Sequence, residues 1–202
     1  MRRQLLLLGC LWLLGMEYTQ AQVVKSYPIQ VSFFNNATLL PGAGELGIFG
    51  LPIHPGVRVG LAFTIRQQTR SQWFQTAQVG YFYHRYVHHA IQLYSETAYR
   101  YDLSADWDVE GMIGLGYLHA IPATPTFTLR DGVYEKRLGL GRPQLMAGLS
   151  LGLGYHLSPD WRIFIQSQFY VQTPFVREYV AVLPNLAFHT GFSFPLVLKS
   201  KS

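Results

Sequence analysis

The stretch that decides the fold is WFQTAQVGYFYHRYVHHAIQLYSETAYRY, from Trp73 to Tyr101. Its odd-numbered positions are mostly large and apolar, and its even-numbered positions are mostly polar or small, with one short break after His84. Alternation with a period of two predicts β-strands with two unlike faces. The stretch therefore predicts a hairpin whose strands are close to the roughly 9 to 11 residues that a tilted strand needs to cross a bilayer.

The same alternation recurs along most of the chain. It predicts eight strands, at residues 27–35, 57–67, 73–84, 89–101, 106–119, 143–156, 161–173 and 185–197. The connections after the second, fourth and sixth strands are short, whereas most of the others are longer. This asymmetry is typical of an outer-membrane barrel, with turns in the periplasm and loops outside. The sequence therefore predicts an all-β protein, an eight-stranded antiparallel transmembrane β-barrel of the up-and-down type.

Composition favours a membrane barrel over the alternative, a soluble barrel or sandwich. Charged residues make up only 13% of the chain, and aromatic residues make up 15%. A soluble barrel would need a densely charged polar face. Here that face is mostly glycine, alanine, serine and glutamine, which suits the lumen of a narrow barrel filled by its own side chains. The net charge of +5 comes without a basic run, so no nucleic-acid partner is expected.

Two sets of residues are expected to occupy special positions in such a barrel. The charges expected to face the lumen are Arg58, Arg66, Glu96, Arg100, Asp106, Asp108, Glu110 and Arg162. The aromatic residues expected to form a girdle at the periplasmic membrane interface are Trp73, Tyr99, Tyr101, Trp107, Tyr155 and Trp161. Because the lumen charges balance, they predict a neutralised plug.

The N-terminus predicts export. Residues 1–21 have two arginines, an apolar run and a small residue, Ala21, at the cleavage point, which is the pattern of a secretory signal peptide. The barrel domain is expected to comprise residues 22–202. LLGC, ending at Cys10, is an alternative lipoprotein cleavage box, but it would cut inside the apolar run. Cys10 is the only cysteine, so no disulfide is predicted.

Glu96 and Glu110 are the first candidates for chemistry. Pairing around the turn at residues 102–105 is expected to bring Glu96 opposite about residue 111, which would make the two carboxylates lateral neighbours. Paired carboxylates can perform acid–base chemistry. The favoured alternative is that both belong to the salt-bridged plug, because buried charges must be paired.

Three neighbouring histidines, His84, His88 and His89, raise the question of a metal site. Adjacent residues on a strand point to opposite faces, so His88 and His89 cannot both ligate one ion unless they lie in a turn. They are expected at a loop tip, as ordinary surface histidines. Neither a metal nor a cofactor is predicted.

A lipid A acyl hydrolase is the enzyme alternative, since small barrels of that kind use a Ser, a His and an acid on the lipid-facing side. The nearest match, His156-Leu157-Ser158, lies in a predicted periplasmic turn. Ser95 and Ser167 are expected to face lipid, but neither has an evident His and acid beside it. No catalytic residue is therefore assigned. A narrow channel for small solutes is a further alternative, because eight strands leave an interior only wide enough for side chains.

Two connections have a character of their own. Residues 124–137 contain Asp131-Gly132 between β-prone runs, a strong hairpin signal, so the flanking strands are expected to continue beyond the membrane. The loop after the first strand is rich in glycine and proline yet apolar. It is expected either to contact a partner or lipopolysaccharide, or to fold over the barrel mouth.

Three segments carry a family resemblance: FQTAQVGYFYHRYVHHAIQLYSETAYRY, GLGYLHAIPATPTFTL and GRPQLMAGLSLGLGYHLS. Across residues 57–197 the chain resembles uncharacterised outer-membrane β-barrel proteins of Bacteroidota of similar length. The resemblance implies an outer-membrane location and a barrel fold, and no catalytic residues. The function expected is a structural, accessory or interaction role through the extracellular loops. The expected partners are outer-membrane lipid and lipopolysaccharide, with another envelope protein as a further candidate.

Overall fold

In this computed structural model, the structure describes residues 27–39, 53–84, 88–130, 132–137, 139–175 and 181–196. The predicted signal peptide and most of the loop after the first strand lie outside the described residues. Within these ranges, no helix is long and apolar enough to cross a membrane.

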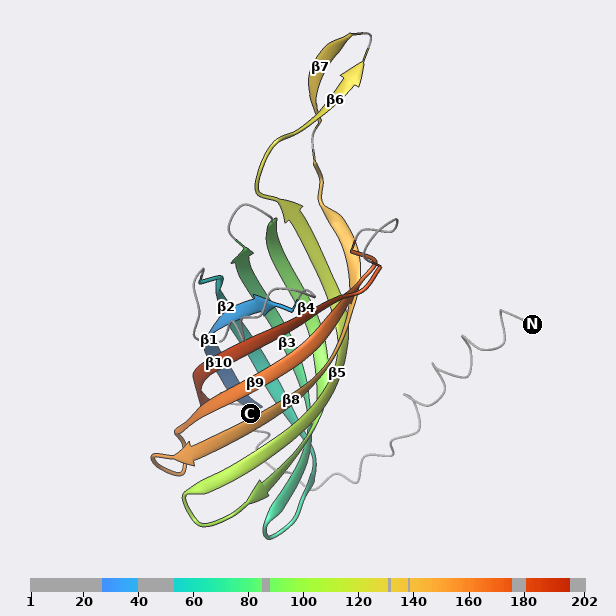
Figure 1. Cartoon of the computed structure of the whole chain (residues 1–202). Coiled ribbons are helices and arrows are strands. Elements are labelled where there is room, and N and C mark those ends of the chain that lie inside the picture. Colours follow the sequence, from blue (N-terminus) through green and yellow to red (C-terminus); the bar gives the residue numbers. More distant parts are fainter. Residues whose placement is uncertain are drawn as a thin grey trace, which may run out of the picture. The chain divides into compact units, whose positions relative to one another are not determined.

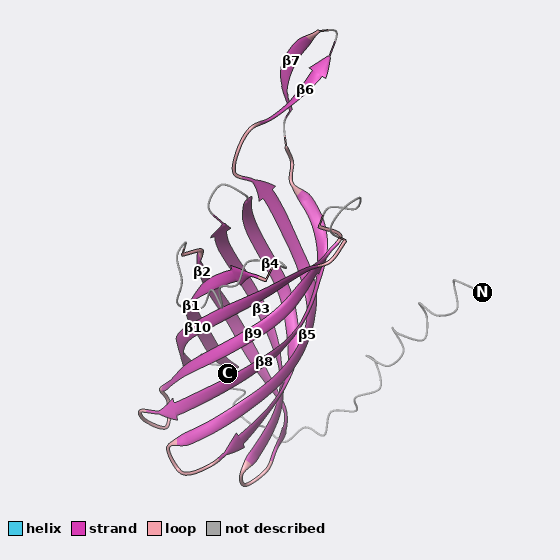
Figure 2. Ribbon diagram, viewed as in Figure 1, coloured by secondary structure: helices cyan, strands magenta, loops and turns pink. Residues whose placement is uncertain are grey.

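Eight strands form one closed antiparallel barrel (Figure 1, Figure 2). They are β1 (Tyr27–Thr38), β2 (Pro55–Gln67), β3 (Ser71–His84), β4 (His88–Asp102), β5 (Trp107–Pro122), β8 (Arg142–His156), β9 (Arg162–Thr173) and β10 (Leu183–Leu196). Neighbours along the chain pair around the barrel, and β10 closes it against β1. This arrangement confirms the predicted fold class. The period-two pattern gives each strand one face for the lumen and one for the outside.

The two ends of the barrel differ in their connections. At one end, here called the turn end, residues 68–70, 103–106 and 157–161 join β2 to β3, β4 to β5 and β8 to β9. At the other end, here called the loop end, most of the connections are longer. The order of short and long connections agrees with the sequence prediction.

The connection between β5 and β8 contains a hairpin of its own. Strands β6 (Thr126–Arg130) and β7 (Val133–Arg137) pair only with each other, as a separate two-stranded sheet (Figure 1). Gly132 adopts a positive φ of 82° at the turn, a conformation that glycine adopts without strain. The hairpin was expected here, but the expectation that it would continue the barrel strands was wrong.

The two faces of each strand have opposite surroundings. Large apolar side chains such as Val79, Ile113 and Leu151 point outward and are exposed. The opposite positions are mostly buried in the lumen, and the buried polar residues described there include many glutamines. With this alternation the barrel is apolar outside and polar inside, the reverse of a soluble barrel that shows its polar face to water.

Two irregularities of strand pairing, besides a bulge in β2, interrupt the otherwise regular ladders. Strand β1 pairs with β10 from Tyr27 to Thr38, but with β2 only from Ile29 to Asn35. Between β3 and β4, the register runs down to Gln78↔Tyr94 and resumes at Gln75↔Thr97, so two pairs are missing. The first irregularity lies where the barrel closes. The second leaves a short stretch of the β3–β4 ladder without backbone pairs.

Candidate functional site

A group of paired charges, here called the ion cluster, fills the lumen near the turn end. It consists of Arg100, Asp108, Glu110, His156 and Arg162. Arg162 Nε donates to Asp108 Oδ2 at 2.6 Å, and Arg162 Nη2 lies 3.0 Å from Glu110 Oε1. Arg100 Nε donates to the same Glu110 oxygen at 2.7 Å. Both carboxylates are buried, so they need such partners to remain charged away from water.

The β4–β5 register explains why the ion cluster forms. Asp102 pairs with Asp108, which places Arg100 directly opposite Glu110 on the lumen face. Glu96 pairs with Gly114 instead of a residue near 111. The expectation that Glu96 and Glu110 are lateral neighbours was therefore wrong, because the hairpin closes three residues further along β5 than the turn composition suggested.

The ion cluster meets solvent at the turn end. His156 Nε2 lies 3.1 Å from Asp108 Oδ2, and its side chain is partly exposed. A hollow of about 480 Å³ opens beside it, lined in part by Arg70, Arg100 and Asp102. His156 thus lies between a buried carboxylate and the mouth of the barrel.

Further into the lumen, Arg58 and Glu96 are charged residues with neutral surroundings. Each is only 1% exposed. Arg58 Nη2 donates to Gln166 Oε1 at 2.9 Å and lies against the ring of Phe164. Glu96 accepts from Gln78 at 2.7 Å, from Ser150 at 2.7 Å and from Gln168 at 3.2 Å. In the described part of the chain, neither residue has an ion-pair partner.

A chain of hydrogen bonds, here called the relay, connects these two charges across the lumen. Arg58 Nε donates to Ser32 Oγ at 2.9 Å, and Ser32 Oγ lies 3.4 Å from His189 Nδ1. His189 Nε2 lies 3.3 Å from Gln168 Oε1, and the amide of Gln168 donates to Glu96. Because the Gln168 oxygen can only accept, we assign the His189 proton to Nε2.

With that tautomer, every donor in the relay points from the cation toward the carboxylate. Hydrogen bonds aligned in this way polarise one another in a low-dielectric interior. The relay therefore stabilises both buried charges without direct contact between them. Sequence reasoning missed Ser32, Gln168 and His189, since only the barrel register brings β1, β9 and β10 to the same height; the polar lumen positions were the only available signal.

Two of the eight predicted lumen charges lie elsewhere. Arg66 is exposed, because a bulge between Thr64 and Arg66 pairs it with the outward-facing Trp73. One extra residue reverses the face of everything beyond it. Asp106 is exposed in the turn before β5. The other six, Arg58, Glu96, Arg100, Asp108, Glu110 and Arg162, line the lumen.

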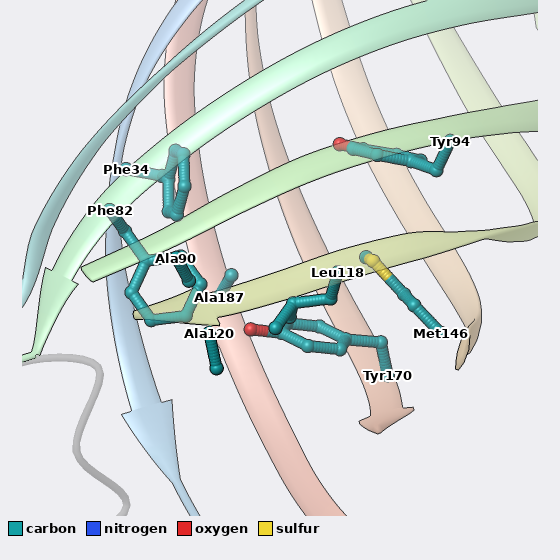
Figure 3. Packing of buried hydrophobic residues seen from close by; sticks show 9 residues of the cluster. All are labelled: Phe34, Phe82, Ala90, Tyr94, Leu118, Ala120, Met146, Tyr170 and Ala187. Carbon is teal, nitrogen blue, oxygen red and sulfur yellow. The ribbon is translucent and has the colours of Figure 1, made fainter. Parts of the chain in front are cut away.

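An apolar layer closes the lumen toward the loop end. Figure 3 shows the nine residues of this layer, which come from seven of the barrel strands: Phe34, Phe82, Ala90, Tyr94, Leu118, Ala120, Met146, Tyr170 and Ala187. Tyr170, fully buried, donates from its hydroxyl to Asn36 Oδ1 at 2.7 Å. Several nearby polar atoms are buried without a partner among the described residues, including both amide atoms of Gln172.

The histidines form a stack at the loop end. The rings of His54 and His84 lie 3.7 Å apart between centroids, and those of His84 and His88 lie 5.6 Å apart. His88 is buried at the start of β4, so the expectation of a surface position was wrong for it. His89 points to the other face and contacts Tyr81. Among the described residues, no three His, Cys, Asp or Glu side chains are arranged to hold a metal ion.

The six predicted girdle aromatics lie on the outer face near the turn end. Trp73 packs on Tyr99 and Trp107 on Tyr155, each pair with centroids 4.9 Å apart. Trp161 stacks on Phe194 at 5.3 Å. Tyr101, paired with Ser71, is also exposed.

Two of the three serines considered for catalysis, Ser95 and Ser158, have other partners. Ser95 accepts from Gln75 and donates to the backbone carbonyl of Thr76. Ser158 accepts from the backbone of Trp161, while His156 faces Asp108. These contacts place the hydroxyls in the wall and in a turn.

No family model and no curated protein matches this sequence. Among solved structures, neisserial surface protein A (NspA) is similar with a TM-score of 0.57 at 8% identity, over 83% of this chain and 96% of that one. The attachment invasion locus protein Ail of Yersinia pestis is similar with a TM-score of 0.45 at 10% identity, over 85% and 97%. The outer membrane enzyme PagL is similar with a TM-score of 0.47 at 14% identity, over 83% and 99%. The likeness to NspA shows that the fold is that of an eight-stranded outer-membrane barrel.

Proposed function

We propose that this chain is an outer-membrane barrel whose lumen is a closed scaffold and whose function is an interaction made by the loop end. The observation that carries the proposal is the hairpin of β6 and β7. It pairs with no other strand, and the side chains of Phe127, Val133 and Tyr134 are each more than half exposed.

The chemistry of the hairpin describes the surface it offers. Phe127 pairs with Lys136, and Leu129 pairs with Tyr134, so one face combines aromatic side chains with a cation. An isolated two-stranded hairpin is marginally stable in water, and clustered exposed apolar residues mark interaction sites. A partner with an apolar surface and negative charge fits this face. Lipopolysaccharide and another envelope protein both have that chemistry.

The filled lumen supports a scaffold over the channel alternative. The ion cluster, the relay and the apolar layer succeed one another along the lumen, and each is built from buried side chains. Passage of a solute would require breaking buried ion pairs and displacing packed aromatic residues. We assign no catalytic residue, and we therefore do not favour the lipid-hydrolase alternative.

The location is part of the proposal. Export by a cleaved signal peptide would put the turn end in the periplasm and the loop end outside the cell. The outward apolar band between aromatic residues supports the membrane location, because such bands and girdles match the hydrocarbon thickness of a bilayer. The short connections at the turn end and the longer ones at the loop end support the orientation.

Site-specific photocrosslinking in intact cells tests the proposal. A photoreactive residue at Tyr134 should give a discrete adduct whose mass identifies lipopolysaccharide or protein. The matched control is the same residue at Leu157, which is equally well exposed but lies at the turn end. The same adduct from both positions, or none from Tyr134, would contradict the interaction. Recovery in the soluble fraction would contradict the location.

A further inference from the structure

Among the described residues, a polar cluster interrupts the apolar outer face of the barrel next to the aromatic girdle. It consists of Gln75, Ser95 and Thr97, here called the notch. Gln75 Nε2 donates to Ser95 Oγ at 2.6 Å, and Thr97 Oγ1 donates to Gln75 Oε1 at 2.7 Å. All three side chains lie on the outer face of the barrel wall, opposite to the face that carries the lumen charges. Polar groups that face lipid are costly unless they are paired.

The notch coincides with the gap in the β3–β4 ladder. There the backbone N–H of Glu96 donates to Thr76 Oγ1 at 3.1 Å, and the hydroxyl of Ser95 donates to the backbone carbonyl of Thr76. Side chains thus replace the two missing backbone pairs. This repair explains Ser95 and Thr76, but it does not require Gln75.

The amide of Gln75 has hydrogen-bonding capacity left over. Its nitrogen carries two hydrogens, and among the described residues only Ser95 accepts one of them. A donor without an acceptor is costly in hydrocarbon, because no water is present to accept its hydrogen. The second hydrogen of the Gln75 amide therefore needs an acceptor that does not belong to this chain.

A groove of about 600 Å³ begins at the notch and crosses β5 and β8 to β9. Its apolar lining comprises Ile113, Leu115, Ala147, Leu149 and Phe169. Ala147 is the small outward residue between the exposed Leu145 and Leu149, so the surface is hollowed there. The volume is within the roughly 300 to 1,000 Å³ of ligand pockets.

The depth of the notch indicates what reaches it. Gln75 pairs with Thr97 one rung of outward residues above the Trp73–Tyr99 pair. For a strand tilted by about 40°, that rung lies about 5 Å further into the membrane than the aromatic girdle. This is just below the headgroups, on the turn-end side, where the fatty-acyl esters of lipids lie.

We propose that the groove holds one acyl chain of a glycerophospholipid from the turn-end leaflet, and that Gln75 donates to the ester carbonyl of that lipid. The inference rests on the membrane location in the proposed function. An ester carbonyl supplies the acceptor that Gln75 lacks, and an acyl chain fills a long apolar hollow. A second copy of this chain would have to insert a protruding surface into the groove, whereas the neighbouring outward residues are large leucines that surround it.

Native mass spectrometry of the purified barrel in detergent provides the test. The probes are palmitoyl-oleoyl phosphatidylethanolamine and its dialkyl ether analogue, which has the same headgroup and chains but no carbonyl. The wild type should bind one ester lipid about two- to tenfold more tightly than the ether lipid, as expected for one hydrogen bond. Gln75→Leu should remove this preference, and Thr190→Val, an exposed outward position on β10, should keep it.

Heat-modifiable migration on gels verifies that each variant is folded. Should Gln75→Leu fail to fold, Thr97→Val serves instead, because Thr97 orients the Gln75 amide, and it should reduce the preference. Equal binding of both lipids by the wild type, or an undiminished preference in the folded variants, overturns the proposal. A dimer that Gln75→Leu dissociates assigns the groove to a second copy and also overturns it. If Tyr134 gives no adduct but the preference for the ester lipid remains, only the proposed hairpin interaction is overturned.

Discussion

The two halves of the lumen are stabilised by different interactions, ion pairs near the turn end and apolar packing near the loop end. Near the turn end, carboxylates and guanidinium groups pair directly, and both Arg100 and Arg162 contact Asp108 and Glu110. Near the loop end, aromatic and aliphatic side chains pack together, and several nearby polar atoms have no partner among the residues that the structure describes. The comparison teaches that one narrow lumen can be closed by charge neutralisation at one end and by apolar packing at the other. Each mechanism predicts a different sensitivity to substitution.

The largest effect is expected from Arg162→Met. The variant leaves the buried Asp108 without its main partner and Glu110 with Arg100 alone, which should cost about 3 to 5 kcal/mol of unfolding free energy. Guanidinium unfolding in detergent, followed by tryptophan fluorescence, measures this loss. Arg66→Met is the control, because Arg66 is exposed, and it should change stability by less than about 0.5 kcal/mol. Equal effects of the two variants would show that the ion cluster is not what holds the turn end.

Leu118→Ala should be the next largest effect, and it tests the loop end. Leu118 is fully buried in the apolar layer, so its truncation should cost about 3 kcal/mol through lost burial and an internal cavity. Leu115→Ala on the same strand is the control, since Leu115 points outward and is 72% exposed. The same denaturation experiment compares them. A smaller loss for Leu118→Ala than for Leu115→Ala would rule out packing as the source of stability here.

Between the two halves, Glu96→Gln should have an intermediate effect of about 2 kcal/mol. Three donors point at the Glu96 carboxylate, and an amide in its place must turn an NH2 group toward at least one of them. Thermal unfolding of the folded barrel measures the change. Ser150→Ala, which removes only one donor, should lose about 1 kcal/mol. A more stable Glu96→Gln barrel would mean that the relay does not balance the buried charge.

The smallest effect concerns pH at the loop end. Burial lowers the pKa of His54, although a hydrogen bond to the backbone carbonyl of Asn36 partly opposes the shift. A histidine with a lowered pKa binds protons more readily when unfolded, so stability should fall as the pH drops below about 6.5. The part of this loss that His54 contributes between pH 7 and pH 5 should stay under about 1 kcal/mol. His54→Phe retains a ring beside His84 and should flatten this part of the pH profile; an unchanged profile would assign it to other groups.

Much of the fold follows from local pattern. The period-two alternation located all eight barrel strands to within a few residues, because each strand has one face in the lumen and one outside. Asp131-Gly132 likewise marked the hairpin of β6 and β7. These features depend on residues close together in the chain, which sequence reasoning can read.

Two of the errors arose where pairing between strands decides the outcome. The bulge before Arg66 and the closing pair Asp102↔Asp108 each displace a register that composition alone had suggested. The relay depends on residues from five strands whose relative heights no local pattern encodes. The ion cluster was foreseeable as a balanced set of charges, whereas its partners were not.

The pairing of β1 has a consequence for how the barrel assembles. β1 pairs along its whole length with β10 and over a shorter span with β2, its neighbour in the chain. The strand that is made first is thus anchored chiefly by the strand that is made last. Closing contacts between distant parts of a chain carries the largest loop entropy and slows folding. The barrel is therefore expected to seal in a single late, rate-limiting event, and a chain that ends before β10 would keep an open edge.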